Sequence, residues 1–291
     1  MASMRDIKRR KVSIQSTQQI TKAMKLVSTV RLQRAKAKAE RSKAYFNCMY
    51  KTVSSILEHS GNATNPYVAG NNSEKKAVVV ISSNRGLAGG FNGNVVKLIT
   101  RNEDTKAWNK GDVEIFAIGN KGREGLVRAG FSIMKSEPEI VEEPLYSDAQ
   151  MVAAELLEKY RAGEIGEIYV AYTEFKNTVT HIPTLIKVLP VGKNESEETD
   201  TQGKLSIPMN YEPEEDEALD LIIPKYVTSI IYGALTQSVA SENGARMQAM
   251  DSATGNAEEM IQNLELQYNR ARQGSITQEL TEIIAGAEAI S

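Results

Sequence analysis

The stretch of sequence that most resembles a chemical site is SSNRGLAGGFNGN at residues 82–94, directly after the apolar run AVVVI at 77–81. Many phosphate sites begin with a buried strand that leads into a glycine-rich turn, because N–H groups at the next helix N-terminus attract anions. The glycines here lack the G-x-G-x-x-G spacing of a dinucleotide site, and the closing FNGN lacks the Lys-Ser/Thr pair of a P-loop. The spacing favours a tight strand-to-helix turn, with a weak anion site as the alternative.

The other residues that could do chemistry do not form a recognisable set. His181 alternates with apolar residues, Cys48 lies in a candidate helix as a small hydrophobe, and Trp108 stands alone among polar residues. One aromatic ring makes no binding platform. The acidic clusters at 195–200 and 212–217 lack the spacing of a calcium loop. Since no Ser/His/Asp or Cys/His set can be assembled, the residues favour a mechanical or scaffolding role over catalysis.

Composition is that of a globular protein, and charge is unevenly distributed. The 291 residues are 41% hydrophobic and 25% charged, and the single cysteine points to a reducing compartment. No run of 18 apolar residues and no secretion signal occurs, which predicts that no segment spans a membrane. Residues 1–60 hold 14 Lys and Arg against 3 Asp and Glu, whereas residues 211–291 hold 4 against 14. The two ends are therefore expected to pair with each other or with different partners.

The N-terminal segment predicts one continuous helix, because residues 6–60 contain neither Gly nor Pro. Its middle, RLQRAKAKAERSKA at 31–44, is basic and rich in Ala, with high helix propensity and little to bury. Apolar residues recur in the first half at Ile20, Met24, Val27 and Val30. The basic part is either a solvated helix face or a shaft that runs past acidic partner surfaces.

The middle of the chain, residues 75–192, alternates between strand and helix patterns. The candidate strands are 77–83, 113–119, 131–136, 167–175 and 179–191, and the candidate helices are 93–102, 121–130 and 147–163. Such alternation predicts a largely parallel sheet covered by helices.

The C-terminal segment predicts a second long helix, because no proline follows Pro224. Its last turns carry apolar residues at the 4-3 spacing of a coiled coil: Ile276, Leu280, Ile283, Ala287 and Ile290. Several glycines interrupt the segment, and each costs up to about 1 kcal/mol against alanine in a helix. This helix must therefore draw its stability from packing.

Together these patterns predict an α/β fold with a long antiparallel coiled coil, in which the terminal helices pair around a central Rossmann-like domain with a mostly parallel sheet. The predicted parts are the N-terminal helix at 1–60, the α/β domain at 74–192, an acidic linker at 193–212 and the C-terminal helix at 213–291. The second helix is expected to extend about ten residues beyond the end of the paired region. Its end is almost uncharged and would need to be enclosed by an apolar sleeve of a partner.

Two stretches resemble one known family, the gamma subunit of rotary ATP synthases. STQQITKAMKLVSTVRLQRAK at 16–36 is similar to that subunit's N-terminal helix, and residues 241–290, with ITQELTEIIAGAEA near the end, are similar to its C-terminal helix. SSNRGLAGGFN also resembles the family's central domain. The resemblance covers essentially the whole chain and is densest at its two ends.

The resemblance implies that the chain is the central rotor shaft, a non-catalytic subunit of an ion-translocating ATP synthase. Ion flow through a membrane ring of c subunits would turn the shaft, which would force the beta catalytic sites through different nucleotide affinities. Three alpha and three beta subunits would surround the coiled coil, and the epsilon subunit would bind the central domain. No cofactor of the chain's own and no nucleic-acid partner is implied.

The resemblance also implies contact residues. The positions that match the family's contacts with the beta subunit are Met24, Arg246, Arg272, Gln273, Thr277 and Glu279, of which the last four match a polar catch. Tyr211 and Glu212, in NYEPEED, match the foot that faces the c ring. The alternative for each position is an ordinary surface residue of a coiled coil.

Departures from the family pattern refine the expected setting. Chloroplast gamma subunits carry an inserted regulatory segment with a cysteine pair, and this chain has one cysteine, so we expect no thiol switch of that kind. We also expect that no transit segment precedes the family motif. The expectation is a bacterial protein bound peripherally to the cell membrane on its cytoplasmic side, with a tagged mature organellar chain as the alternative.

Two other functions compete with the shaft on the residues alone. The stretch at 82–94 would fit a nucleotide-using α/β enzyme with helical arms. The basic first helix would fit a nucleic-acid clamp, although the acidic partner helix argues against it.

Overall fold

The computed structural model describes residues 4–59, 65–191 and 215–289. The chain divides into two compact units, one made of residues up to Thr29 and from Arg246 onward, the other of Val30–Ala245. The long helices α1 (Met4–His59) and α7 (Glu215–Glu288) contribute residues to both units. The four-part division of the chain expected from the sequence stays a prediction.

A five-stranded sheet organises the unit Val30–Ala245, with strand order β3-β2-β1-β4-β5. The strands are β1 (Lys76–Ile81), β2 (Val113–Ile118), β3 (Ser132–Ser136), β4 (Glu167–Phe175) and β5 (His181–Leu189). The first four are parallel, and β5 pairs with β4 antiparallel. The mostly parallel sheet predicted from the alternating patterns is confirmed.

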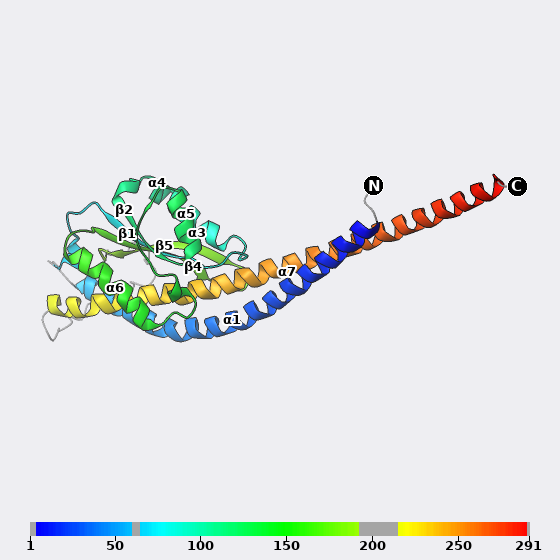
Figure 1. The fold of residues 1–291 in the computed structure, drawn as a ribbon. Helices are drawn as coiled ribbons and strands as arrows, with labels where there is room; N and C mark the ends of the chain where they lie inside the picture. Colours follow the sequence, from blue (N-terminus) through cyan, green and yellow to red (C-terminus); the bar gives the residue numbers. More distant parts are fainter. Residues whose placement is uncertain (1–3, 60–64, 192–214, 290–291) are drawn as a thin grey trace. The chain divides into compact units, whose positions relative to one another are not determined.

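Helices cover both faces of this sheet. On one face lie α3 (Phe91–Arg101) and α5 (Asn120–Arg128), and on the other lie α6 (Tyr146–Arg161) and the parts of α1 and α7 that belong to this unit (Figure 1). Side chains alternate along each strand, so Val78 and Val80 of β1 pack toward α3 and α5, whereas Val79 and Ile81 pack toward α6 and α7.

Short elements complete the unit around the sheet. They are α2 (Pro66–Ala69), α4 (Glu103–Lys106) and two 3-10 turns at Lys110–Asp112 and Glu139–Val141. The Asn65 side chain accepts a hydrogen bond from the Tyr67 N–H at 3.0 Å and so caps α2.

The helix α7 supplies the most apolar helical surface of this core. Among the described residues, α7 is the one helix that is long and apolar enough, by length and composition alone, to cross a membrane, although the sequence was expected to contain no such segment. More than half of the apolar window is buried inside the protein. Ile223, Val227 and Ile231 of α7 are fully buried in the sheet core. The apolarity is therefore that of a helix packed on a sheet.

In the other unit α1 and α7 pair as an antiparallel coiled coil. The side-chain contacts that join them include Lys11 Nζ to Glu265 Oε1 at 2.9 Å, the hydroxyls of Thr21 and Thr254 at 2.8 Å, and Lys25 Nζ to Asp251 Oδ1 at 2.6 Å. Residue numbers on α7 fall as those on α1 rise, in nearly equal steps. The helices therefore keep one register along the pair.

Buried and half-buried positions on both helices include a 4-3 repeat. On α1 they are Ile7, Lys11, Ile14, Gln18, Thr21, Lys25 and Ser28, and on α7 they are Met250, Thr254, Ala257, Ile261, Leu264, Tyr268 and Ala271. This spacing is the seam of a coiled coil, so the predicted pairing of the terminal helices is confirmed.

The seam on α1 is not the apolar stripe that the sequence suggested. Ile20 and Val27 are 57% and 55% exposed, whereas the polar Thr21 and Ser28 are buried. The Thr21 hydroxyl can be buried because it lies 3.0 Å from the Gln18 carbonyl, to which it can donate, as well as near its partner hydroxyl. In this stretch of α1 the polar Thr21 and Ser28 thus lie on the buried side, and the apolar Ile20 and Val27 lie on the exposed side.

Two glycines of α7 make a matched test of this packing. A Cβ at Gly244 would lie 2.7 Å from Cε1 of the buried His181 ring, whereas a Cβ at Gly255 would meet nothing within 4 Å. Gly244→Ala is expected to lower the free energy of unfolding by about 1–3 kcal/mol through overpacking. Gly255→Ala is expected to raise it by up to about 1 kcal/mol, because alanine has the higher helix propensity.

Urea denaturation of the full chain, followed by circular dichroism, measures both changes. Equal stability of the two variants would contradict the packing described for Gly244.

Candidate functional site

The glycine-rich turn lies at the carboxyl end of β1, the edge at which open α/β sheets bind ligands. Ser82 is buried, and its hydroxyl accepts a hydrogen bond from the Gly122 N–H at 2.8 Å and donates to the Gly119 carbonyl at 3.2 Å. The Ser83 N–H donates to Asn92 Oδ1 at 2.9 Å. These polar groups of Ser82 and Ser83, which could otherwise face a phosphate, are therefore bonded to the protein itself.

Asn84 closes the same edge of the sheet. Its side-chain amide donates to the Pro138 carbonyl at 2.7 Å, and its Oδ1 accepts from the Asn120 N–H at 3.2 Å. Asn120 is the first residue of α5, so a protein oxygen already occupies an N–H of that helix N-terminus. Gly119 has a φ of +100°, and a Cβ there would overlap the Ser82 carbonyl. The turn is built from its own hydrogen bonds, as the tight-turn interpretation expects.

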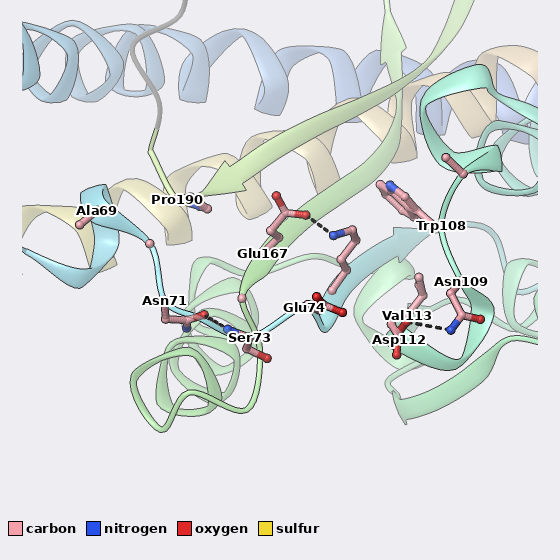
Figure 2. Close-up of a pocket in the computed structure, with 14 residues that line it drawn as sticks. Ala69, Asn71, Ser73, Glu74, Trp108, Asn109, Asp112, Val113, Glu167 and Pro190 are labelled. Atoms are coloured by element: carbon pink, nitrogen blue, oxygen red, sulfur yellow. Dashed lines mark hydrogen bonds and ion pairs between the residues drawn. The ribbon is translucent and has the colours of Figure 1, made fainter.

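A cavity of about 540 Å³ opens at the opposite edge, where β1, β2 and β4 begin (Figure 2). One wall is the segment from Ala69 to Glu74, and the other is the loop from Ala107 to Val113. Lys76, Gly166, Glu167 and Pro190 complete the lining. Trp108 stands in the second wall, with its ring centroid 4.8 Å from that of Tyr169. Polar and apolar side chains thus face the same hollow.

Glu167 lies in this cavity at the start of β4 and is paired with two lysines. Its carboxylate oxygens lie 2.6 Å from Lys76 Nζ and 2.6 Å from Lys187 Nζ. Burial by itself would raise the pKa of Glu167, but the hydrogen bonds and charges of Lys187 and Lys76 together outweigh it and hold that pKa below its ordinary value. The carboxylate therefore stays ionised and ties β1, β4 and β5 together.

The structure describes six of the eight residues predicted to contact partners. Met24 and Arg246 are half-buried on the coiled coil, and the exposed ones lie on α7: Arg272, Gln273, Thr277 and Glu279. Tyr211 and Glu212 lie outside the described residues. Among the described residues, no three His, Cys, Asp or Glu side chains could hold a metal ion together.

The four exposed residues that were predicted to contact beta lie where α7 extends beyond the start of α1. The register that joins Lys11 to Glu265 places Met4, the first residue of α1, opposite about residue 272. Beyond that point α7 continues to Glu288 (Figure 1). The exposed apolar residues on this part are Ile276, Leu280, Ile283 and Ile284. The unpaired part of α7 exceeds the ten or so residues expected.

The predicted contact residues do not form one site. By the same register Met24 lies opposite about residue 252, which is about 30 Å along the helix from Arg272. Met24 and Arg246 therefore belong to the paired part of the coiled coil, and the polar catch belongs to the unpaired part of α7. The predicted contact residues therefore fall into two separate regions.

The cavity was not predicted from the sequence, which presents Trp108 only as a lone aromatic. Tyr169, whose ring packs against that of Trp108, lies far along the chain in strand β4. The one available signal was a tryptophan in a polar loop, and that pattern has no fixed meaning.

Comparisons with known proteins agree with this geometry. The family model described as ATP synthase matches residues 3–290. The chain is 59% identical to the ATP synthase gamma chain of Lachnoclostridium phytofermentans over the full length of both. It is 40% identical to the ATP synthase gamma chain, sodium ion specific, of Acetobacterium woodii, with 99% of each chain covered.

Solved structures show the same fold at low sequence identity. A chain of the Euglena gracilis mitochondrial ATP synthase, in its OSCP/F1/c-ring structure, matches with a TM-score of 0.69 at 16% identity, covering 99% of this chain and 94% of that one. A chain of the Tetrahymena thermophila central stalk and c-ring structure matches with a TM-score of 0.57 at 20% identity, covering 80% and 99%. Paired terminal helices around an inserted α/β sheet define a central-stalk type of protein. The chain belongs to the ATP synthase gamma-chain family.

Replacing Glu167 with Gln is expected to lower the free energy of unfolding by about 1–2 kcal/mol near pH 7. The pKa of Glu167 is lower in the folded protein than in the unfolded chain, where a glutamate titrates near ~4.3. The ionised Glu167 therefore stabilises the folded protein at pH values above the pKa of the unfolded chain. This stabilisation is lost as the pH falls through the lower pKa of the folded protein. The gap in stability between wild type and variant should shrink below about pH 4.

Urea denaturation at several pH values checks this dependence. Glu158→Gln, at an exposed position of α6, is the control and should change stability little at any pH. A gap that stays constant down to about pH 3 would contradict the role given to the Glu167 charge.

Proposed function

We propose that this chain is the rotor shaft of a rotary ATP synthase and couples ion flow through a membrane ring of c subunits to the catalytic cycle of the beta subunits. The single observation that carries the proposal is the full-length family match to gamma chains. The unpaired, apolar end of α7 supports it. A helix end with Ile276, Leu280 and Ile283 exposed requires a partner that covers it, because single helices are marginal in water.

The partners proposed for the coiled coil are three alpha and three beta subunits arranged around it. An apolar sleeve from these subunits would cover the end of α7 without demanding directional bonds, which suits a shaft that turns. The Lys- and Arg-rich α1 would face acidic lever regions of the beta subunits. Long-range charge attraction suits a surface that meets three copies of one partner in turn.

The polar catch is the proposed point of tighter contact with beta. Arg272, Gln273, Thr277 and Glu279 project from the unpaired part of α7 and are exposed. An arginine can pair with a carboxylate through two hydrogen bonds, which gives directional contact where the neighbouring apolar residues give none. Met24 and Arg246 would contact beta in the paired part of the coiled coil, away from the free end of α7.

The foot is proposed to rest on the c ring through Tyr211 and Glu212, with the epsilon subunit on the α/β domain. The complex is membrane-associated, and we place this chain on the cytoplasmic side of a bacterial cell membrane. The four-part division expected from the sequence fits this arrangement, with the helices in the head and the central domain near the membrane.

We also propose that the chain has no catalytic site of its own and that alpha and beta subunits bind the nucleotides. The support is the carboxyl edge of the sheet, where Ser82, Ser83 and Asn84 bond to the protein. Calorimetry of the isolated chain with ATP, ADP and NAD tests the competing enzyme function. Micromolar affinity for any of them would favour the enzyme.

Reconstitution tests the shaft directly. Alpha and beta subunits of the same enzyme are assembled with and without this chain, and ATP hydrolysis by the assembled head is measured. The proposal expects hydrolysis to depend on the chain. Equal activity in its absence would overturn the proposal.

A double substitution in the catch, Arg272→Ala with Gln273→Ala, is expected to reduce ATP hydrolysis by the reconstituted head roughly 5- to 20-fold. This range corresponds to about 1–2 kcal/mol of lost contact with beta. The control is Gln262→Ala with Asn263→Ala, two exposed positions on the paired part of α7. If both doubles hydrolyse ATP at the same rate, the catch has no special role.

A further inference from the structure

We propose that the cavity at the amino edge of the sheet is a docking pocket for an arginine side chain of a partner protein. The pocket combines an aromatic wall, Trp108, with two carboxylates, Glu74 and Asp112, that have no cationic partner among the described residues. This assignment goes beyond the shaft function, which gives no role to any residue of this cavity.

The aromatic wall is Trp108, held in place by the ring of Tyr169. Their centroids lie 4.8 Å apart, with the ring planes tilted by 50°. Trp108 is half-buried, so part of its indole lines the open hollow (Figure 2). The tryptophan ring is the best aromatic surface for a cation, and a planar guanidinium can stack on it.

The charge of the pocket is negative once its own ion pairs are taken into account. Lys76 is a cation in the lining, and its ammonium lies 2.6 Å from Glu167, which is also paired with Lys187. Asp112 accepts a hydrogen bond of 2.9 Å from the side-chain amide of Asn109. Because this donor is neutral, it does not compensate the negative charge of the carboxylate. Glu74 lines the same hollow. Two lysines share the one Glu167 carboxylate, so one positive charge remains there. Together with Glu74 and Asp112, these five groups carry a net charge of −1, which favours an incoming cation.

The walls of the pocket are fixed before anything binds. The Asn71 amide donates to the carbonyls of Tyr160 at 3.1 Å and Ile165 at 2.7 Å, and its Oδ1 accepts from the Ser73 N–H at 3.1 Å. Gly166 passes so close to the Ser73 carbonyl that a Cβ there would overlap it. A hollow that is already formed loses little entropy on binding.

Arginine fits these features better than other cationic side chains. Its guanidinium is flat enough to lie on an indole while its N–H groups reach two carboxylates, whereas lysine offers only a compact ammonium. A volume of about 540 Å³ is within the range of pockets that hold small ligands, so one side chain and its neighbours would fit. We assign the arginine to a protein because this chain belongs to a family of subunits of a larger complex.

The first test uses Trp108 as its own probe, because the chain has a single tryptophan. The intact chain is titrated with the peptide acetyl-Gly-Arg-Gly-amide, and indole fluorescence is followed. A saturable change is expected, at least about tenfold weaker with the matched citrulline peptide, which keeps the shape and loses the charge. Glu74→Gln with Asp112→Asn is expected to weaken arginine-peptide binding at least about tenfold.

The control for the charge variant is Glu142→Gln with Glu143→Gln, two exposed carboxylates away from the pocket lining, which should leave the titration unchanged. Equal affinity for the arginine and citrulline peptides, or no saturation up to about 50 mM, would overturn the proposal.

The second test asks whether a protein supplies the arginine. In a Cys48→Ser background, Asn109→Cys places a thiol in the pocket wall, and a maleimide–benzophenone reagent is attached before assembly of the whole complex. Crosslinking to a partner segment that contains an arginine is expected, with loss of the crosslink when that arginine is changed to Gln. Equal maleimide reactivity in the free chain and in the complex would overturn docking of a protein arginine.

These outcomes are separable from those for the shaft. The peptide titration uses the isolated chain and does not depend on ATP hydrolysis. Failure of the reconstitution test would leave the arginine pocket in place, and failure of the titration would leave the shaft in place.

Discussion

The packing of α7 on the sheet is the interaction on which the unit Val30–Ala245 depends. A helix of 74 residues that contains Pro224 and several glycines cannot be held by helix propensity. Ile223, Val227 and Ile231 are fully buried against the sheet, and each such side chain contributes about 1.5–3 kcal/mol by leaving water. Packing therefore decides that this segment is one helix, and it gives the α/β core an apolar layer that α6 alone does not supply.

The coiled-coil unit lacks a comparable core. Its seam includes hydroxyls, small side chains and two ion pairs with exposed carboxylates, Lys11–Glu265 and Lys25–Asp251, and exposed pairs of this kind contribute less than about 1 kcal/mol each. Apolar residues such as Ile20 and Ile283 are exposed instead. A helix pair built in this way is suited to partners that surround it, as a shaft inside a ring of subunits would require.

The two edges of the sheet differ in how their polar groups are used. At the carboxyl edge the side chains of Ser82 and Asn84 form hydrogen bonds with the backbone of neighbouring turns. Many α/β proteins bind their ligands at this edge, and here these two side chains are used within the protein instead. At the amino edge Glu74 and Trp108 line an open cavity. The domain therefore offers its recognition chemistry at the edge away from the glycine-rich turn that first suggested a nucleotide.

The sequence by itself determined the type and order of the five strands and the long helices, but not of the short helices and 3-10 turns between them. Runs such as AVVVI predicted β1, the absence of Gly and Pro predicted α1, and the end motifs indicated the family, because these signals are local. Only the tertiary structure decided which face of α1 meets α7, since Thr21 and Ile20 are neighbours on one helix and the facing helix selects between them. It also decided that the Trp108 ring packs against Tyr169 and that Trp108 and Glu74 line one cavity. Such contacts join distant segments, so no local period encodes them.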